Sequence, residues 1–108
     1  MKKRNIKNVR LSEKEIRVIK ETAKEIFGKG VKVYIFGSRA DLTKKGGDID
    51  IFIETDKTTS IKDEIKFLAV LERKGIERKV DLVVKSKNKK YRPIFEEAKK
   101  TGVLLWVI

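Results

Sequence analysis

The sequence has 108 residues, close to the commonest size of one domain, and its 28 lysines and arginines against 16 acidic residues give a formal net charge of +12. It lacks cysteine and histidine, which excludes disulfides, zinc held by thiolates or imidazoles, and a Ser-His-Asp triad. Any bound metal must therefore lie among oxygen ligands, which favours Mg²⁺ or Mn²⁺.

The composition also bears on location and stability. No apolar run approaches the roughly 20 residues of a membrane span, and the basic segment Lys2-Lys3-Arg4 is not followed by the apolar core of a signal peptide. We therefore expect a cytoplasmic protein without membrane association. Glutamine is absent and charged residues make up 41% of the chain, a composition typical of hyperthermophile proteins. This predicts an unfolding midpoint above the mesophile range.

The first predicted element is a helix over Glu13–Phe27. Ser12 and Glu15 have the spacing of a capping box, and Gly28 and Gly30 close the helix. Its apolar face repeats at helical spacing, with the members Ile16, Ile19, Ala23, Ile26 and Phe27. The β-branched and aromatic run at 31–36 then predicts a first strand.

A polar connection over 38–47 leads to a second predicted strand over 48–54. This connection is shorter than the dozen or more residues of a parallel crossover, so we expect the two strands to be antiparallel. Ser60 can cap a second helix over 61–74, ended by Gly75. The apolar face expected for this helix is Ile61, Ile65, Leu68 and Leu71.

The third strand is predicted over 78–84, and the preceding helix allows it to run parallel to the second. Pro93 suits the first turn of a third helix that ends near Gly102. The apolar run 103–107 predicts a last strand, in which Trp106 is either a core residue or an exposed anchor. The result is a single domain over 1–108 of α/β (α+β-like) class, with a mixed sheet of about four strands and about three helices.

The second strand carries two acids on one face. Side chains alternate along a strand, so Asp48 and Asp50 point the same way, about 7 Å apart, while Ile49, Ile51 and Ile53 face the core. Like charges on one face are unfavourable unless a cation lies between them, and Mg²⁺ takes carboxylate oxygens together with substrate phosphates. The alternative is a pair of solvent-exposed aspartates on an edge strand.

Asp81 is the single acid within the apolar third strand. If this strand lies beside the second, Asp81 can join the other two carboxylates, and three clustered carboxylates can hold two ions about 3.5–4 Å apart. The alternative is a salt bridge from Asp81 to Arg78 or Lys79.

The first strand ends in Phe36-Gly37-Ser38-Arg39. Gly37 lets a ligand approach the backbone, Ser38 offers a hydroxyl and an N–H at the start of a helical turn, and Arg39 can pair with a phosphate. The alternative is an ordinary strand-to-helix turn with a serine cap.

In combination, Gly37-Ser38, Gly47-Asp48-Ile49-Asp50-Ile51 and Val80-Asp81-Leu82 resemble the signature of the DNA polymerase beta-type nucleotidyltransferase superfamily. The closest likeness is to its smallest members, the minimal nucleotidyltransferases, and it covers most of the chain. The resemblance implies that Asp48 and Asp50 bind two Mg²⁺ ions. It implies that Asp81 binds the catalytic ion and helps to deprotonate the attacking hydroxyl. Gly47 departs from the pattern, because these proteins often carry Ser or Thr there.

The same resemblance extends to substrate and partner. Gly37 and Ser38 would hold the outgoing pyrophosphate of a nucleoside triphosphate, with Arg39 as a further phosphate contact. Minimal nucleotidyltransferases are antitoxins that can transfer AMP from ATP to a tyrosine of a small helical HEPN-type toxin. The chain has no room for the second domain of larger relatives, so we expect a helical partner. The alternatives are a non-catalytic module that masks such a partner, and a homo-oligomer joined through the last strand.

A basic nucleic-acid-binding domain is the other alternative, since positive charge attracts polyanions. Two basic clusters support this alternative. They are Lys85, Lys87, Lys89, Lys90 and Arg92 after the third strand, and Lys2, Lys3, Arg4, Lys7 and Arg10 at the start of the chain. Tyr91 is the one aromatic residue within either cluster, so the sequence shows no stacking platform. Solvated lysines, or steering of ATP or a partner, are the favoured interpretation.

Overall fold

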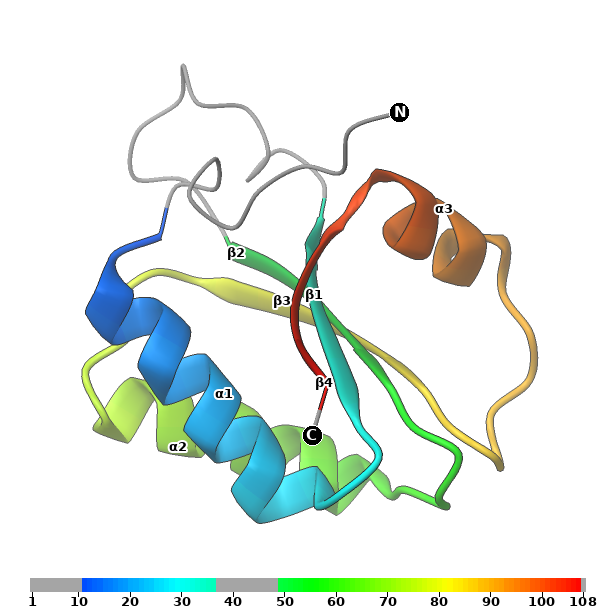
Figure 1. Ribbon diagram of the computed structural model, residues 1–108. Helices are drawn as coiled ribbons and strands as arrows, with labels where there is room; N and C mark the ends of the chain where they lie inside the picture. Colours follow the sequence, from blue (N-terminus) through cyan, green and yellow to red (C-terminus); the bar gives the residue numbers. More distant parts are fainter. Residues whose placement is uncertain (1–10, 37–48, 108) are drawn as a thin grey trace.

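The structure is a computed structural model that describes residues 11–36 and 49–107. Its elements follow the predicted order (Figure 1): α1 Glu13–Phe27, β1 Lys32–Phe36, β2 Ile49–Glu54, α2 Ile61–Arg73, β3 Val80–Lys85, α3 Pro93–Thr101 and β4 Val103–Val107. The strands form one four-stranded sheet in the order β3-β2-β1-β4. β1 is antiparallel to both β2 and β4, whereas β2 and β3 are parallel. The predicted mixed α/β sheet is confirmed.

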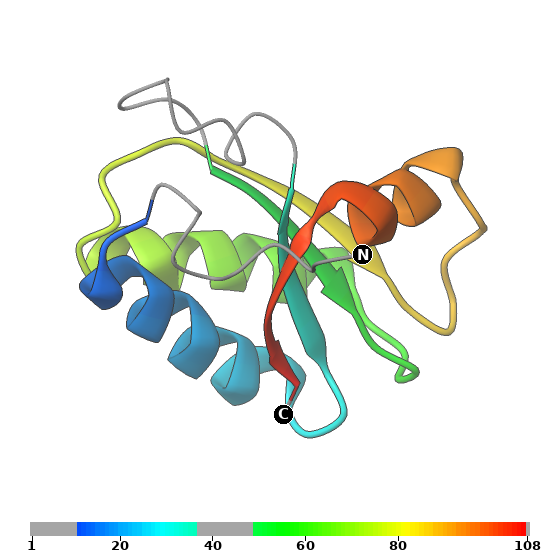
Figure 2. The same ribbon diagram turned by 45° about the horizontal axis from the view of Figure 1, so that its top comes forward.

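The sheet separates two apolar clusters. α1 and α2 lie on one face of the sheet (Figures 1 and 2), and the isoleucines of β2 are fully buried in the cluster on that face. α3 covers part of the opposite face, where Phe95 packs on Phe52 and Phe52 on Tyr34. Both faces of β2 therefore carry buried side chains. The isoleucines are buried on one face, and Phe52 is a core residue on the face of Asp50.

Two helices begin with the reciprocal bonds of a capping box, which was predicted for the first helix, whereas only a Ser60 cap was predicted for the second. At α1, Ser12 Oγ accepts from the Glu15 N–H at 3.1 Å, and the Ser12 N–H donates to Glu15 Oε1 at 2.9 Å. Ser60 and Asp63 make the same pair of bonds at the start of α2. These bonds satisfy N–H groups that lack a partner within the helix.

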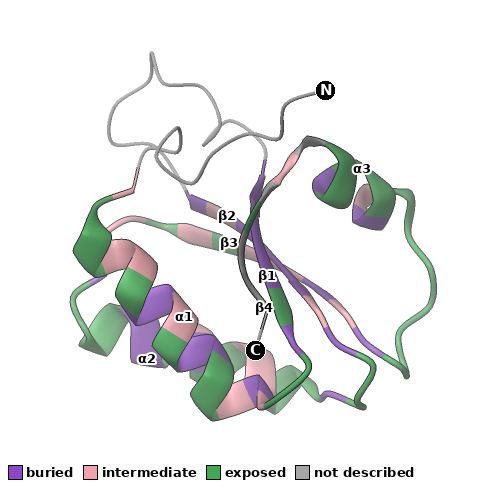
Figure 3. Cartoon of the chain, in the orientation of Figure 1, coloured by how far each residue is buried: buried purple, intermediate pink, exposed green. Residues whose placement is uncertain are grey.

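The predicted apolar face of α2 is partly wrong. Ile61 and Ile65 are 72% and 62% exposed, while Phe67, Val70 and Leu71 are buried (Figure 3). The physical reason is that α2 packs against both α1 and the sheet, so the buried stripe centres on its bulkiest side chain. The Phe67 ring lies 5.6 Å from the ring of Phe27 on α1.

The third strand is displaced relative to its predicted range 78–84, since β3 covers Val80–Lys85. Arg78 instead reaches back to α1, where its guanidinium donates to Glu15 Oε1 at 3.2 Å. At the other end, the register with β2 continues to Lys85, which pairs with Glu54. Among the described residues, no helix is both long and apolar enough to cross a bilayer.

Candidate functional site

Asp50 and Asp81 lie directly opposite each other on neighbouring strands. They are register partners in the parallel pair of β2 and β3, and therefore share a sheet face. Asp50 is half-buried and Asp81 is exposed. Adjacent strands lie about 4.8 Å apart, so the two carboxyl groups can approach a common ligand. The expectation that the third strand brings Asp81 beside the second strand is confirmed.

The alternative placement of Asp81, in a salt bridge to Arg78 or Lys79, is not observed. Arg78 pairs with Glu15, and within residues 11–36 and 49–107 no ion pair of Asp81 is present. Two carboxylates that share a sheet face supply the oxygen ligands that a hard divalent ion takes. The pair therefore has the donor atoms of a site for such an ion.

Four of the predicted site residues lie outside the described residues: Gly37, Ser38, Arg39 and Asp48. What the structure fixes is where the chain enters and leaves that segment. Phe36, the residue before Gly37, is the register partner of Asp50. Ile49, the residue after Asp48, donates its N–H to the Lys79 carbonyl at 2.9 Å, two residues before Asp81. Both ends of the segment therefore lie at the Asp50–Asp81 end of the sheet.

The donor set fits a magnesium ion as far as it is described. Carboxylate oxygens are the ligands Mg²⁺ prefers, and it binds through one or two carboxylates together with substrate phosphates. In the part of the chain that the structure describes, no cluster of three acidic residues forms. Asp50 and Asp81 thus supply two carboxylates, and the predicted third ligand, Asp48, lies outside the described residues.

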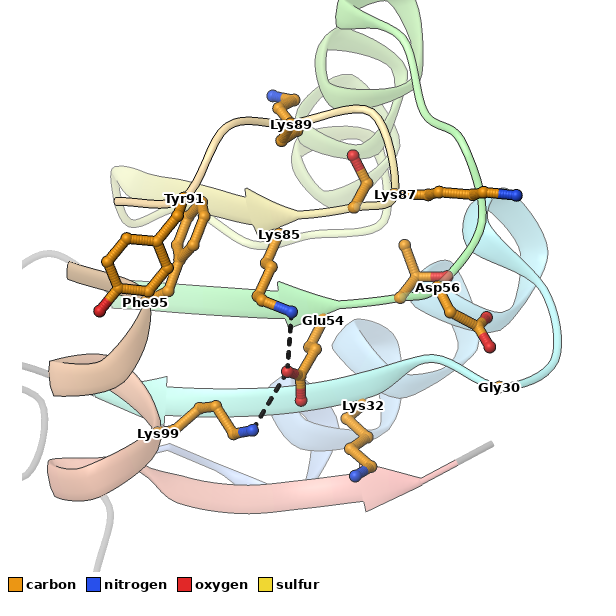
Figure 4. Close-up of a pocket in the computed structure, with 12 residues that line it drawn as sticks. Gly30, Lys32, Glu54, Asp56, Lys85, Lys87, Lys89, Tyr91, Phe95 and Lys99 are labelled. Carbon is orange, nitrogen blue, oxygen red and sulfur yellow. Dashed lines mark hydrogen bonds and ion pairs between the residues drawn. The ribbon is translucent and has the colours of Figure 1, made fainter. Parts of the chain in front are cut away.

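A pocket of about 660 Å³ lies at the opposite end of the same sheet face (Figure 4). Glu54 lies on its floor, where Oε2 is 3.1 Å from Lys99 Nζ and 3.6 Å from Lys85 Nζ. Neither Glu54 nor Lys99 was among the residues predicted from the sequence. The alternation of side chains along β2 could have indicated Glu54, because it places Glu54 on the same face as Asp50, opposite Lys85.

The charge of Glu54 shifts the protonation of two neighbours. Hydrogen bonding and attraction to Glu54 raise the pKa of Lys99 above its ordinary value. Burial raises the pKa of the Tyr34 phenol, and Glu54 raises it further, while Lys99 acts in the opposite direction. Both groups thus hold their protons more tightly in the folded protein than in the unfolded chain.

This predicts a loss of stability in alkali. Raised folded-state pKa values contribute stability that is fully present below the ordinary values, 10.0 for tyrosine and 10.5 for lysine, and is lost as the pH rises through the folded ones. The free energy of unfolding should fall above about pH 10, and in Glu54→Gln it should fall less steeply. Guanidinium unfolding at a series of pH values measures both slopes. Equal slopes would show that Glu54 does not couple to these groups.

Comparison with known proteins agrees with the fold and the motifs. The family model described as "Nucleotidyltransferase domain" matches residues 16–102. No curated protein matches the chain significantly. Among solved structures, the toxin–antitoxin MntA-HepT is similar with a TM-score of 0.67 and 18% identity, covering 90% of this chain and 74% of that one.

Two further similar structures come from Shewanella oneidensis. One has a TM-score of 0.68 at 16% identity and covers 91% of this chain and 74% of that chain. The other is a tri-AMPylated HEPN toxin in complex with MNT antitoxin, with a TM-score of 0.64 at 20% identity, covering 87% of this chain and 71% of that chain. At such identities the likeness shows the fold, whereas the family model spans most of the chain. The chain therefore belongs to the nucleotidyltransferase domain family, as its polymerase beta-type motifs predicted, and is an enzyme of the nucleotidyltransferase class.

Proposed function

We propose that this chain is a single nucleotidyltransferase domain over 1–108 that transfers AMP from ATP to a hydroxyl of a partner protein, with Mg²⁺ as cofactor. The observation that carries the proposal is the facing pair Asp50 and Asp81, at the end of the sheet where β1 leads into the Gly-Ser segment. The family match supports nucleotidyl transfer as the reaction class.

In this proposal the carboxylates of Asp48, Asp50 and Asp81 hold two divalent ions. When bound, such ions neutralise phosphate charge and stabilise the attacking and leaving oxygens. Gly37 and Ser38 bind the β- and γ-phosphates through backbone N–H groups and a hydroxyl, and Arg39 adds a charge-assisted contact. This face of the sheet is therefore expected to fix the triphosphate in line with the acceptor hydroxyl.

The proposed step is a displacement at the α-phosphate. The acceptor oxygen forms a bond to phosphorus, the bond from that phosphorus to the β-phosphate oxygen breaks, and pyrophosphate leaves. Asp81 accepts the proton of the acceptor hydroxyl, directly or through water. The exposure of Asp81, compared with the half-buried Asp50, suits a group that meets an incoming acceptor.

We further propose a helical HEPN-type toxin as the acceptor, with this chain as its antitoxin acting in the cytoplasm. The support is that two similar structures carry the names of toxin–antitoxin complexes and that one of the toxins is AMPylated. Each transfer of AMP would add a negatively charged phosphodiester to the toxin.

The test uses the full chain with Mg²⁺, α-labelled ATP and a helical protein encoded beside it. We expect label in the partner and a mass increase in steps of one AMP, with no label when EDTA replaces Mg²⁺. An unlabelled, unmodified partner that nevertheless forms a stable complex would contradict the proposed reaction.

A second experiment separates catalysis from masking. The double variant Asp50→Asn/Asp81→Asn is co-expressed with the toxic partner, and growth is measured. If neutralisation requires transfer, growth should be lost while the complex still forms in a pull-down. Full rescue by the double variant would show that binding is sufficient.

A further inference from the structure

The pocket at the Glu54 end of the sheet carries positive charge that the proposed transfer does not use. Its lining includes five lysines against two carboxylates, those of Glu54 and Asp56. Glu54 is engaged by two of the lysines, and Lys89 pairs with Glu64 on α2. Within the described ranges, Lys32 and Lys87 have no ion-pair partner. The pocket therefore has more cations than carboxylates, and on its floor Glu54 pairs through Oε2 while its buried Oε1 has no hydrogen-bond partner among the described residues.

The turn after β3, which bears Lys87, is held by hydrogen bonds of neutral side chains, whereas Lys32 lies on β1. Thr59 and Ser86 are buried, and Thr59 Oγ1 donates to Ser86 Oγ at 3.0 Å. Asn88 Oδ1 accepts from Ser86 Oγ at 2.7 Å and from the Thr59 N–H at 3.0 Å, while Asn88 Nδ2 donates to the Thr59 carbonyl at 2.8 Å. A fully bonded network of this kind rigidifies the turn. Lys87 is thus presented from a preorganised backbone, which lowers the entropy lost when a ligand binds.

An aromatic ring stands at the edge of the same pocket. Tyr91 is 61% exposed, and its ring meets the buried Phe95 edge-on at 6.2 Å and 89°. A hydrogen bond to Glu96 raises the pKa of the Tyr91 phenol above its ordinary value. The ring is therefore packed on Phe95 and remains largely open to solvent. Figure 4 shows Tyr91 on the same side of the sheet as Lys85 and Lys99.

We propose that this pocket binds phosphate-bearing nucleotide units of a single-stranded nucleic acid, with Tyr91 stacking on a base and Lys32 and Lys87 contacting phosphates. Its volume of about 660 Å³ lies in the range of small-ligand sites. The combination of a basic groove with an exposed aromatic ring is the one that single-strand binders use. An acidic peptide would use the lysines but would have no use for the ring face, and for that reason the nucleotide is favoured.

The proposal is tested by fluorescence anisotropy with a short labelled oligoadenylate, using the full chain in EDTA to keep metal ions from the Asp50–Asp81 end. Tyr91→Ala should weaken binding by about fivefold to a hundredfold, because one stacked base is lost, and Tyr91→Phe should bind as the wild type does. In Lys32→Ala/Lys87→Ala the slope of log affinity against log salt should become shallower by about 1.4.

The matched control is Lys62→Ala/Lys66→Ala, which removes the same charge from the exposed side of α2. This variant should leave oligonucleotide affinity within about twofold of the wild type. Because no transfer reaction is measured, the result is independent of the proposed function. Unlabelled AMP that competes only weakly identifies the strand as the ligand. AMP that competes as well as the oligonucleotide assigns the same pocket to a free nucleotide.

Besides equal competition by AMP, three results would overturn the proposal. One is an affinity unchanged by Tyr91→Ala. Another is an equal loss in the α2 control, which would mean that the net charge of +12 attracts any polyanion. The third is competition by an oligoglutamate of the same charge that matches the oligonucleotide. The thermal midpoint of each variant shows that it is folded.

Discussion

Replacing Asp81 by Asn is expected to lower the rate of AMP transfer by on the order of 10³-fold or more while leaving the protein folded. The amide cannot accept the proton of the acceptor hydroxyl, and it is a poor ligand for a hard divalent ion. Losses of this size are typical when a group that acts in the transition state is removed. Asp50→Asn should have a comparable effect, since the two residues face each other across β2 and β3.

The stability of the Asp81→Asn protein is the second readout. Asp81 has no ion pair among the described residues and faces Asp50, so removing its charge should leave the free energy of unfolding in EDTA the same or raise it. Asp56→Asn is the matched control, because it makes the same substitution at an exposed acid in the pocket at the other end of the sheet. Transfer is measured as labelled partner over time. An Asp81→Asn protein that transfers AMP at the wild-type rate would remove Asp81 from the site.

Truncating Phe67 to alanine should cost about 3–5 kcal/mol of unfolding free energy, the typical cost for a fully buried phenylalanine. Its side chain is 0% exposed and contacts Phe27, so the cavity would open between α2 and α1. Ile65→Ala, two residues earlier on the same helix, should change the stability by at most about 0.5 kcal/mol, because Ile65 is 62% exposed.

Guanidinium unfolding of both variants gives the comparison directly. It distinguishes the observed packing of α2 from the face predicted by the sequence, in which Ile65 was a core position and Phe67 was not. A larger loss in Ile65→Ala than in Phe67→Ala would show that the predicted face is the buried one. Any partner that covers Ile61 and Ile65 must be absent from this measurement, since bound protein stabilises the native state.

Much of the fold followed from local signals. The cap at Ser12, the β-branched run before Phe36 and the proline at position 93 each specify an element through interactions within a few residues. The short connection between the first two strands decided their antiparallel pairing, because a parallel crossover needs more chain. The bounds of β3 were less predictable, because Arg78 is held by Glu15 on a distant helix.

The site, too, was predictable only in part from the sequence. Asp50 and Asp81 were candidates because an acid in an apolar strand needs a partner. From the sequence, the two acids were expected to lie together only if the third strand is next to the second. The parallel register of β2 and β3 shows that it is. The roles of Gly37, Ser38, Arg39 and Asp48 stay predictions.

What the sequence determined by itself is the kind of ligand atom available: in a chain without histidine or cysteine, a metal ion must be held by oxygens. The tertiary structure alone decided which carboxylates face each other and which face of α2 is buried. It also decided that Tyr91, Glu54 and Lys99 line one pocket. The physical reason is that composition and spacing act along the chain, whereas register and helix packing depend on residues brought together from distant positions.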